Sequence, residues 1–245
     1  AQKDEEGINF LSLYYLLRRN HRLRHRYAAL AREMAAEEKD EKRKKELLSI
    51  AEACERCPDC AQNLPGVSAG LWLTYVGIRW RHMSAVSAAA SGPVRLSFPE
   101  ADLEAGRITE AEAQELLDCL WMKFPETNYI NSEHQSYVVS GFPPTADHCG
   151  RTDPDGKDAT NLLSYMALQA SINTGLHQPS ISIRYFEGTP DDFIEQGMPP
   201  STEGNGHPSF FNDLRCVPAL VYKGVSLEDA RDYCSVGCAS IQPTQ

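Results

Sequence analysis

An alternating segment between two helix signals limits most strongly how this chain can fold. Its sequence, PSISIRY at residues 179–185, puts one set of side chains on each side of a strand: Ile181, Ile183 and Tyr185 opposite Ser180, Ser182 and Arg184. This period of two predicts a strand with one polar face. Residues 158–174 before it predict a helix that ends at Gly175, and TPDD at residues 189–192 predicts the start of another. Helix, strand and helix in succession are typical of α/β packing.

Helical spacing marks three further parts of the chain. Residues 27–36 carry an apolar stripe, and the same spacing resumes after a charged stretch, which predicts two helices joined by a polar turn. The two stripes are Tyr27, Leu30, Ala31, Met34 and Ala35, then Leu47, Leu48, Ile50, Ala51 and Cys54. Thr109 and Glu112 form a capping box, which predicts a helix ending near Pro125. Ser226 begins a short helix that is expected to reach Tyr233.

Charge and hydropathy exclude two classes of partner. The 245 residues carry a net charge of −10 and a mean hydropathy of −0.43, without the run of ~18 apolar residues that a membrane span needs. Arginines cluster at positions 18, 19, 22, 24 and 26, but the rest of the chain is acidic and no nucleic-acid motif accompanies them. The chain has no secretory signal at its first residues, so we expect a cytoplasmic protein with reduced thiols and no nucleic-acid or membrane partner.

The cysteines fall into two groups. Cys54, Cys57 and Cys60 form a C-x2-C-x2-C pattern, and Cys234 and Cys238 lie near the end of the sequence. Thiolates with the first spacing can bind zinc or an iron–sulfur cluster, although zinc needs a fourth ligand. A redox-active pair and ordinary surface thiols are the alternatives. We expect no metal site, with Cys54, Cys57 and Cys60 as the weak candidates.

Seven stretches of the chain, in order, resemble the glycyl radical enzymes, relatives of pyruvate formate-lyase. They are RYAALAREMAAEE, KELLSIAEACE, EADLEAGRITEAEAQELLDCLWMKF, DGKDATNLLSYMALQA, QPSISIRYFEGTPDDF, GHPSFFND and GVSLEDARDYCSVGC. The resemblance implies an α/β fold, a partial α/β barrel of the glycyl radical enzyme type with an N-terminal helical segment. On this basis we expect a helical segment at residues 1–65, an irregular or linker-like region at 66–99, and a partial barrel segment at 100–245 that ends in a cysteine loop.

The resemblance also implies a chemistry for Cys238. In the family a glycyl radical takes hydrogen from a cysteine in the barrel, and the resulting thiyl radical takes hydrogen from an unactivated carbon of a small-molecule substrate. By resemblance Cys238 is this cysteine, Gly237 permits a tight loop, and Cys234 is a packing residue. No cofactor is expected to bind directly, but a protein glycyl radical is required. The implied partners are the substrate, a radical S-adenosylmethionine activating enzyme and a second copy in a homodimer.

Several residues depart from the family pattern. Many members carry a glutamate two positions after the cysteine, where this chain has Ser240, a candidate substrate-binding residue whose neutral hydroxyl cannot act as a carboxylate base. The pyruvate formate-lyase subgroup has two adjacent cysteines, and this chain has Cys238 alone. The Arg-Val-x-Gly motif of the radical glycine is missing. We therefore expect a lyase segment that is incomplete on its own, or else a non-catalytic truncated paralogue that associates with a full-length enzyme; a small Cys-rich metal-binding protein is the third alternative.

Overall fold

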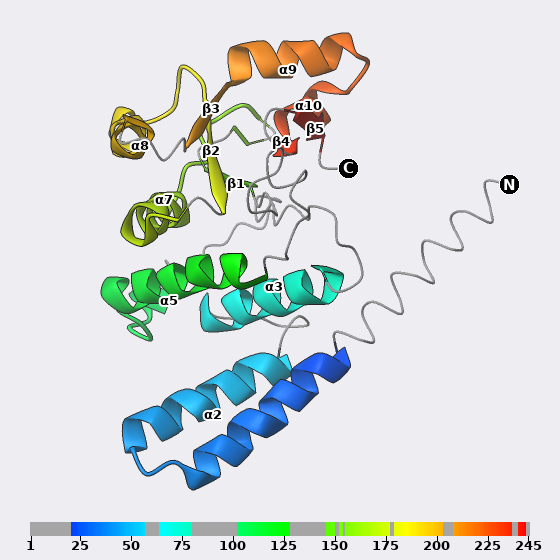
Figure 1. The fold of residues 1–245 in the computed structure, drawn as a ribbon. Coiled ribbons are helices and arrows are strands. Elements are labelled where there is room, and N and C mark those ends of the chain that lie inside the picture. The colour runs from blue at the N-terminus through cyan, green and yellow to red at the C-terminus, as the bar shows by residue number, and fades with distance from the viewer. Residues whose placement is uncertain are drawn as a thin grey trace, which may run out of the picture. The chain divides into compact units, whose positions relative to one another are not determined.

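The computed structural model describes residues 21–56, 64–79, 102–127, 146–149, 152–153, 155–176, 179–202, 208–236 and 240–243. The chain divides into two compact units, Ala1–Met83 and Ser84–Gln245. Figure 1 shows the elements of both units along the chain. In the described part of the chain, no helix combines the length and the apolar content that crossing a bilayer requires.

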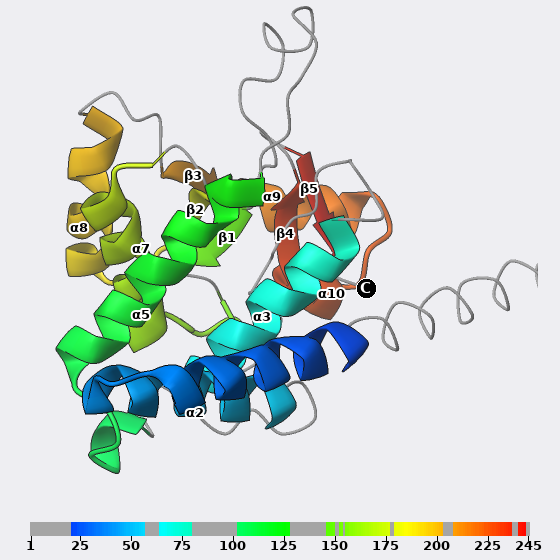
Figure 2. The same ribbon diagram turned by 60° about the horizontal axis from the view of Figure 1, so that its bottom comes forward.

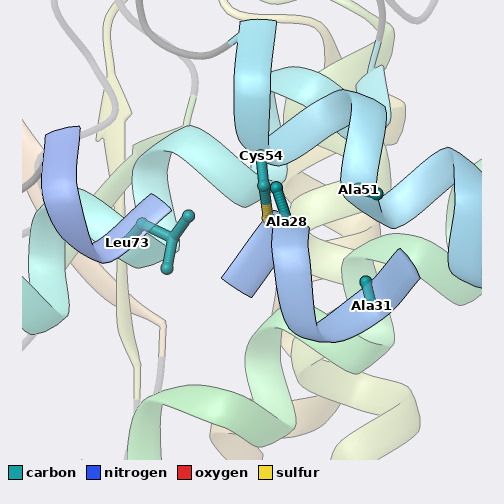
Figure 3. Packing of buried hydrophobic residues seen from close by; sticks show 5 residues of the cluster. All are labelled: Ala28, Ala31, Ala51, Cys54 and Leu73. Atoms are coloured by element: carbon teal, nitrogen blue, oxygen red, sulfur yellow. The ribbon is translucent and has the colours of Figure 1, made fainter. Parts of the chain in front are cut away.

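The first unit is helical. A helix over residues 21–37 is followed by α2 (Glu41–Arg56) and α3 (Leu64–Arg79), so the predicted helix pair with its short polar turn is present. The core between these helices is built mainly from small side chains, as Figure 3 shows: Ala28, Ala31, Ala51, Cys54 and Leu73. Alanine side chains allow helix backbones to approach closely. On the surface the Arg32 guanidinium donates to the Glu55 carboxylate and joins the two helices.

The buried side of the first helix matches the predicted stripe only in part. Ala31 and Ala35 of the stripe are buried, but Tyr27, Leu30 and Met34 are 46%, 50% and 49% exposed, and Ala28, outside the stripe, is buried. The hydrophobic spacing identified the helix correctly but also assigned the larger apolar side chains to its core. The buried side consists of alanines and is rotated toward Ala28, which follows Tyr27 by about 100° around the helix axis.

Helix α3 corrects part of the prediction for residues 66–99. The region was expected to be irregular, but Leu64–Arg79 forms a continuous helix, with Leu73 and Tyr75 buried. Glycines and a proline in the segment lower its helix propensity. Most of the remaining side chains are apolar, so there is no contrast between faces from which a sequence pattern could identify a helix. Residues 80–99 lie outside the described residues.

The second unit contains a parallel sheet built from three strands. They are β1 (Ala146–Cys149), β2 (Ser180–Tyr185) and β3 (Ser209–Asn212), with β2 in the centre. Ile181 pairs with Asp147 on one side, and Arg184 pairs with Phe211 on the other. Helix α7 (Leu162–Thr174) connects β1 to β2, and α8 (Asp191–Thr202) connects β2 to β3. The predicted α/β class is therefore present as an open βαβαβ unit.

The helices α7 and α8 lie on one side of this sheet. Figures 1 and 2 show both on the same side, away from β4 and β5. Ile183 of β2 points toward α8, because a Cβ added to Gly197 would meet the Cδ1 of Ile183 at 2.5 Å. Ile181, on the same face of β2, is also fully buried. One face of β2 is thus an apolar layer against the crossover helices.

The sequence signals for the helix ends are confirmed with small shifts. Thr109 and Glu112 form the predicted capping box at α5 (Glu110–Lys123), and Gly175 ends α7 with a left-handed φ of 59°. The N-cap of α7 is Asn161 rather than Asp158, whose carboxylate accepts a hydrogen bond from the Thr160 hydroxyl instead.

Side-chain amides and one carboxylate join the helices α5, α7 and α8. Helix α5 packs on α7, and α7 packs on α8. A chain of hydrogen bonds runs across them: Gln196 of α8 donates to Gln169 of α7, Gln169 to Asn173, and Asn173 to Asp118 of α5, with donor–acceptor distances of 3.1, 2.8 and 2.9 Å. Gln114 donates to the other oxygen of Asp118 at 2.8 Å. We call these five residues the amide ladder.

The chain then leaves the sheet through two helices and a hairpin. Helix α9 (Asp213–Tyr222) begins directly after β3, and α10 (Leu227–Arg231) begins at its N-cap Ser226, as predicted. The predicted end is wrong, because α10 stops at Arg231 and Tyr233, which was expected to lie in the helix, is the first residue of a strand. Strands β4 (Tyr233–Val236) and β5 (Ser240–Pro243) pair antiparallel. The hairpin lies on the side of the sheet opposite α7 and α8 (Figures 1 and 2).

Candidate functional site

The second face of β2 is polar and completely enclosed. Arg184 is 0% exposed and Ser182 is 5% exposed, so the polar side of this strand does not face solvent. Parallel strands are usually buried on both faces, and buried polar groups then need partners within the protein. The partners of these two side chains come from β4 and from the first residue of α9.

Arg184 forms a two-point ion pair with Asp213. Its Nε donates to Oδ1 of Asp213 at 3.1 Å, and its Nη2 donates to Oδ2 at 2.7 Å. Asp213 is 5% exposed, so both charges are shielded from water. A planar guanidinium matches a carboxylate in this fork geometry, and the two charges neutralise each other.

Tyr233 completes this cluster from β4. The phenol donates to Oδ1 of Asp213 at 2.6 Å, and the Tyr233 carbonyl accepts from Nη1 of Arg184 at 3.2 Å. The guanidinium carbon of Arg184 also lies 3.9 Å from the centre of the Tyr233 ring, a cation–π contact. We refer to Arg184, Asp213 and Tyr233 as the β2–β4 cluster.

A second polar contact lies beside the cluster. The hydroxyl oxygens of Ser182 and Ser235 are 3.3 Å apart, and Ser235 is 1% exposed. Residues 182 and 184 share one face of β2, and residues 233 and 235 share one face of β4. On the facing sides of the two strands, Tyr233 and Ser235 of β4 therefore contact Arg184 and Ser182 of β2.

The electrostatics keep Tyr233 neutral. Burial raises the pKa of the Tyr233 phenol far above its ordinary value; the positive charge of Arg184 opposes this shift, and the charge and hydrogen bond of Asp213 add to it. The phenol therefore remains a donor to Asp213 at physiological pH. Every nitrogen of the Arg184 guanidinium donates within the cluster, so the cluster binds its own chain and does not offer Arg184 to a ligand.

In the sequence, the predicted catalytic residue falls between the two strands of the hairpin. Cys238 belongs to residues 237–239, which lie outside the described residues. The residues on either side, Val236 of β4 and Ser240 of β5, are register partners in the hairpin. Ser240 itself begins β5. The short segment that carries Cys238 thus joins two paired strand ends.

The other cysteines have distinct environments. Cys234 is half-buried in β4, and burial, followed by the negative charge of Asp232, raises the pKa of its thiol, so its sulfur stays protonated at neutral pH. Cys54 is 5% exposed within the helical core of the first unit (Figure 3). Cys57 and Cys60 lie outside the described residues. Among the residues that the structure does describe, no three His, Cys, Asp or Glu side chains are grouped to hold a metal ion.

The sequence interpretation missed the β2–β4 cluster. It assigned no chemistry to Asp213 and placed Arg184 on a polar strand face without a partner. A signal for burial was available, because a strand between two crossover helices is central in a parallel sheet and has no free face. Which carboxylate would meet Arg184 could not be read from the sequence, since Asp213 and Tyr233 are distant along the chain.

Comparisons with known proteins identify the family of the chain. The family model described as pyruvate formate lyase-like matches residues 2–245. The chain belongs to this family. It is 34% identical to isethionate sulfite-lyase from Desulfovibrio desulfuricans over 218 residues, which cover 87% of this chain and 26% of that protein.

Solved structures extend the similarity to the fold. A structure from a study of 1,2-propanediol dehydration in Roseburia inulinivorans matches with a TM-score of 0.86 and 30% identity, over 91% of this chain and 27% of that one. A glycyl radical enzyme from Archaeoglobus fulgidus matches with a TM-score of 0.84 and 28% identity, over 92% and 29%. The resemblance to glycyl radical enzymes is confirmed, and the chain spans between a quarter and a third of the length of these relatives.

Proposed function

We propose that this chain is the part of a glycyl radical lyase that carries the hydrogen-transferring thiol, and that Cys238 is that thiol. The single observation that supports the proposal is the placement of β4 and β5, which residues 237–239 connect along the chain. Strand β4 is held by buried contacts on the face of the sheet opposite the helices α7 and α8. In a barrel of α/β type this face is the interior.

The proposed chemistry moves one hydrogen atom at a time. Cys238 gives its sulfur-bound hydrogen to a glycyl radical, which becomes an ordinary glycine, and the sulfur becomes a thiyl radical. The thiyl then takes a hydrogen atom from a substrate carbon, which restores the S–H bond and leaves a substrate radical. After the substrate bond breaks, the product radical takes the hydrogen back from Cys238. Such radicals need an environment that excludes water and oxygen, and an enclosing barrel supplies it.

The names of the relatives support a proposal for the substrate class. Their names describe a sulfite-lyase and a diol dehydration, which are eliminations of a group from a small molecule. We propose that the complete protein cleaves a carbon–oxygen or carbon–sulfur bond in a small molecule, in an anaerobic cytoplasm, after activation by a radical S-adenosylmethionine enzyme. Ser240 follows Cys238 by two positions in the sequence, and in this proposal it contributes a neutral hydroxyl to substrate binding.

The test supplies the missing radical glycine separately. The 245-residue chain is incubated anaerobically with an activating enzyme, first alone and then with a separately expressed radical-glycine segment of the sulfite-lyase. We expect no glycyl doublet by electron paramagnetic resonance with the chain alone. With the added segment we expect the doublet and cleavage of isethionate or 1,2-propanediol.

Two cysteine variants form a matched pair for this test. Cys238→Ala should retain the glycyl doublet and lose cleavage, while Cys234→Ala, four residues earlier, should retain both. Cleavage by Cys238→Ala would overturn the role of this thiol. A doublet with cleavage by the chain alone would overturn its incompleteness.

The alternative is a non-catalytic paralogue, and the observation that favours it is Ser240. A hydroxyl at this position cannot supply the carboxylate that many family members use beside the thiol. The same experiment separates the two, since a paralogue of this kind would accept the radical-glycine segment without any cleavage. A Ser240→Glu variant that gains cleavage would then locate the defect at this residue.

A further inference from the structure

Strand β4 is attached to the sheet by side chains rather than by a strand ladder. It pairs only with β5 in the described part of the chain, and β5 belongs to the same hairpin. Its connections to β2 are the contacts of Tyr233 with Arg184 and of Ser235 with Ser182. No ladder joins β4 to β2 among the described residues, although β4 also lies against β1. The side-chain contacts are therefore the specific interactions that define the position of β4 along β2.

The contacts of Tyr233 specify one position and not a range of them. Its ring and its carbonyl contact the Arg184 guanidinium, and its phenol oxygen contacts the Asp213 carboxylate. Asp213 is buried, so no water replaces the phenol if the strand slides. Apolar contacts between two strand faces would tolerate sliding more easily, because they are not directional.

A sliding movement would carry Cys238 with it. A shift of one residue moves a strand by about 3.3 Å and turns each side chain to the opposite face. Cys238 follows Tyr233 by five positions and Ser235 by three. Displacement of a reacting group by about 1 Å is enough to reduce the rate of a catalysed step by about 100-fold.

We propose that Arg184, Asp213 and Tyr233 are positioning residues that fix the register of β4 on β2 and thereby hold the Cys238 thiol in one place. The claim that the position of this thiol affects catalysis rests on the proposed function. The claim that the three residues fix the register of β4 on β2 is independent of it. Ser182 and Ser235 act as a second, weaker point of attachment. None of these residues touches the substrate in this proposal.

The experiment compares two tyrosine variants that lose the same kind of bond. Tyr233→Phe removes the phenol that donates to Asp213, and Tyr165→Phe removes a phenol that donates to Asp192 at 3.1 Å between α7 and α8. For each folded chain, iodoacetamide labelling followed by peptide mass mapping gives the alkylation rate of Cys238. Cys119, an exposed cysteine of α5, serves as the internal reference.

The expected result is specific to the hairpin. Tyr233→Phe should raise the alkylation rate of Cys238 relative to Cys119 by about tenfold, the change in a local opening equilibrium expected for loss of one hydrogen bond to a buried charged group. Amide hydrogen exchange should accelerate in residues 233–243 and stay unchanged in α7. Tyr165→Phe should leave Cys238 at the rate of the unchanged protein.

The proposal is overturned if both variants label Cys238 at the same rate, or if exchange rises equally in the hairpin and in α7, which indicates a general loss of stability. If Tyr233→Phe does not fold, Ser235→Ala provides the second variant, with an increase in the same direction at Cys238 expected. Alkylation needs no glycyl radical. A failure of the positioning proposal is therefore distinguishable from a failure of the radical chemistry.

Discussion

The two faces of β2 are buried to the same degree and are held by different forces. On one face Ile181 and Ile183 lie on the side of α7 and α8, where close packing of apolar atoms stabilises the contact. On the other face Ser182 and Arg184 meet β4 through hydrogen bonds and an ion pair. The apolar face contributes stability in proportion to buried area, whereas the polar face favours one arrangement over its neighbours.

The same comparison separates two tyrosine–aspartate pairs. Tyr165 and Asp192 join two helices at the surface, and Tyr233 and Asp213 join β4 to the sheet in the interior. Only the interior pair has an arginine beside the carboxylate and burial that excludes competing water. Identical side chains should therefore differ widely in their effect on the free energy of unfolding.

The largest effect is expected from removal of the buried carboxylate. Asp213→Ala leaves the Arg184 guanidinium buried without its counter-charge, and we expect a loss of about 3–5 kcal/mol in the free energy of unfolding. Asp192→Ala removes an exposed carboxylate and should cost less than about 1 kcal/mol. Urea unfolding followed by circular dichroism measures both. Equal losses for the two variants would show that burial does not distinguish the two pairs.

The apolar face is tested at the contact between α8 and β2. Gly197→Ala places a methyl group 2.5 Å from Ile183 Cδ1, and the resulting overpacking should cost about 1–3 kcal/mol, partly offset by the better helix propensity of alanine. Ile183→Val removes that Cδ1 atom. We expect the variant with both substitutions to lose less free energy of unfolding than the sum of the two single losses. A double-mutant cycle measures this difference. Strict additivity would contradict the close contact.

The smallest expected effect is a dependence of the free energy of unfolding on pH, which Tyr233 causes because it is buried. Burial raises the pKa of Tyr233 in the folded chain, while the unfolded chain releases this proton near pH 10.0. The folded state thus retains a proton that the unfolded state loses above pH 10. The contribution of the protonated Tyr233 phenol to the free energy of unfolding is complete below pH 10. Above pH 10 it falls by about 1.4 kcal/mol per pH unit, until the pKa of Tyr233 in the folded chain is reached.

Comparison of the unchanged protein with Tyr233→Phe isolates this effect. The difference between their unfolding free energies should narrow from pH 10 to pH 11, because phenylalanine has no proton to release. Urea unfolding at closely spaced pH values measures it. Parallel curves for the two proteins over this range would mean that Tyr233 ionises as easily in the folded chain as in the unfolded one.

Local signals in the sequence predicted local structure well. The capping box at Thr109, the stop at Gly175 and the alternation around Ile183 each correspond to a helix end or a strand in the structure. These features depend on residues within one or two turns of each other, so a short window contains the physical cause.

Features that depend on distant residues were not predictable in the same way. The alternation in β2 separated polar from apolar side chains, but it did not show that β4 would cover the polar side. On the first helix, hydrophobicity selected Tyr27 and Leu30 along with the alanines of the stripe, but the structure leaves both large side chains about half exposed and buries Ala28 instead. In both cases the deciding quantity is the space left by another segment. For Cys238 the family pattern, and not local periodicity, supplied the prediction.

The amide ladder has a consequence for how this chain can tolerate insertions. Gln169 and Asn173 project from α7 with the rotational phase that lets one reach α8 and the other reach α5. One additional residue between them would turn the lower half of α7 by about 100° and move these groups to different sides of the helix. In related sequences, insertions and deletions should therefore occur in the connections outside α7. A related sequence with an insertion or deletion inside that helix would lack the amide ladder.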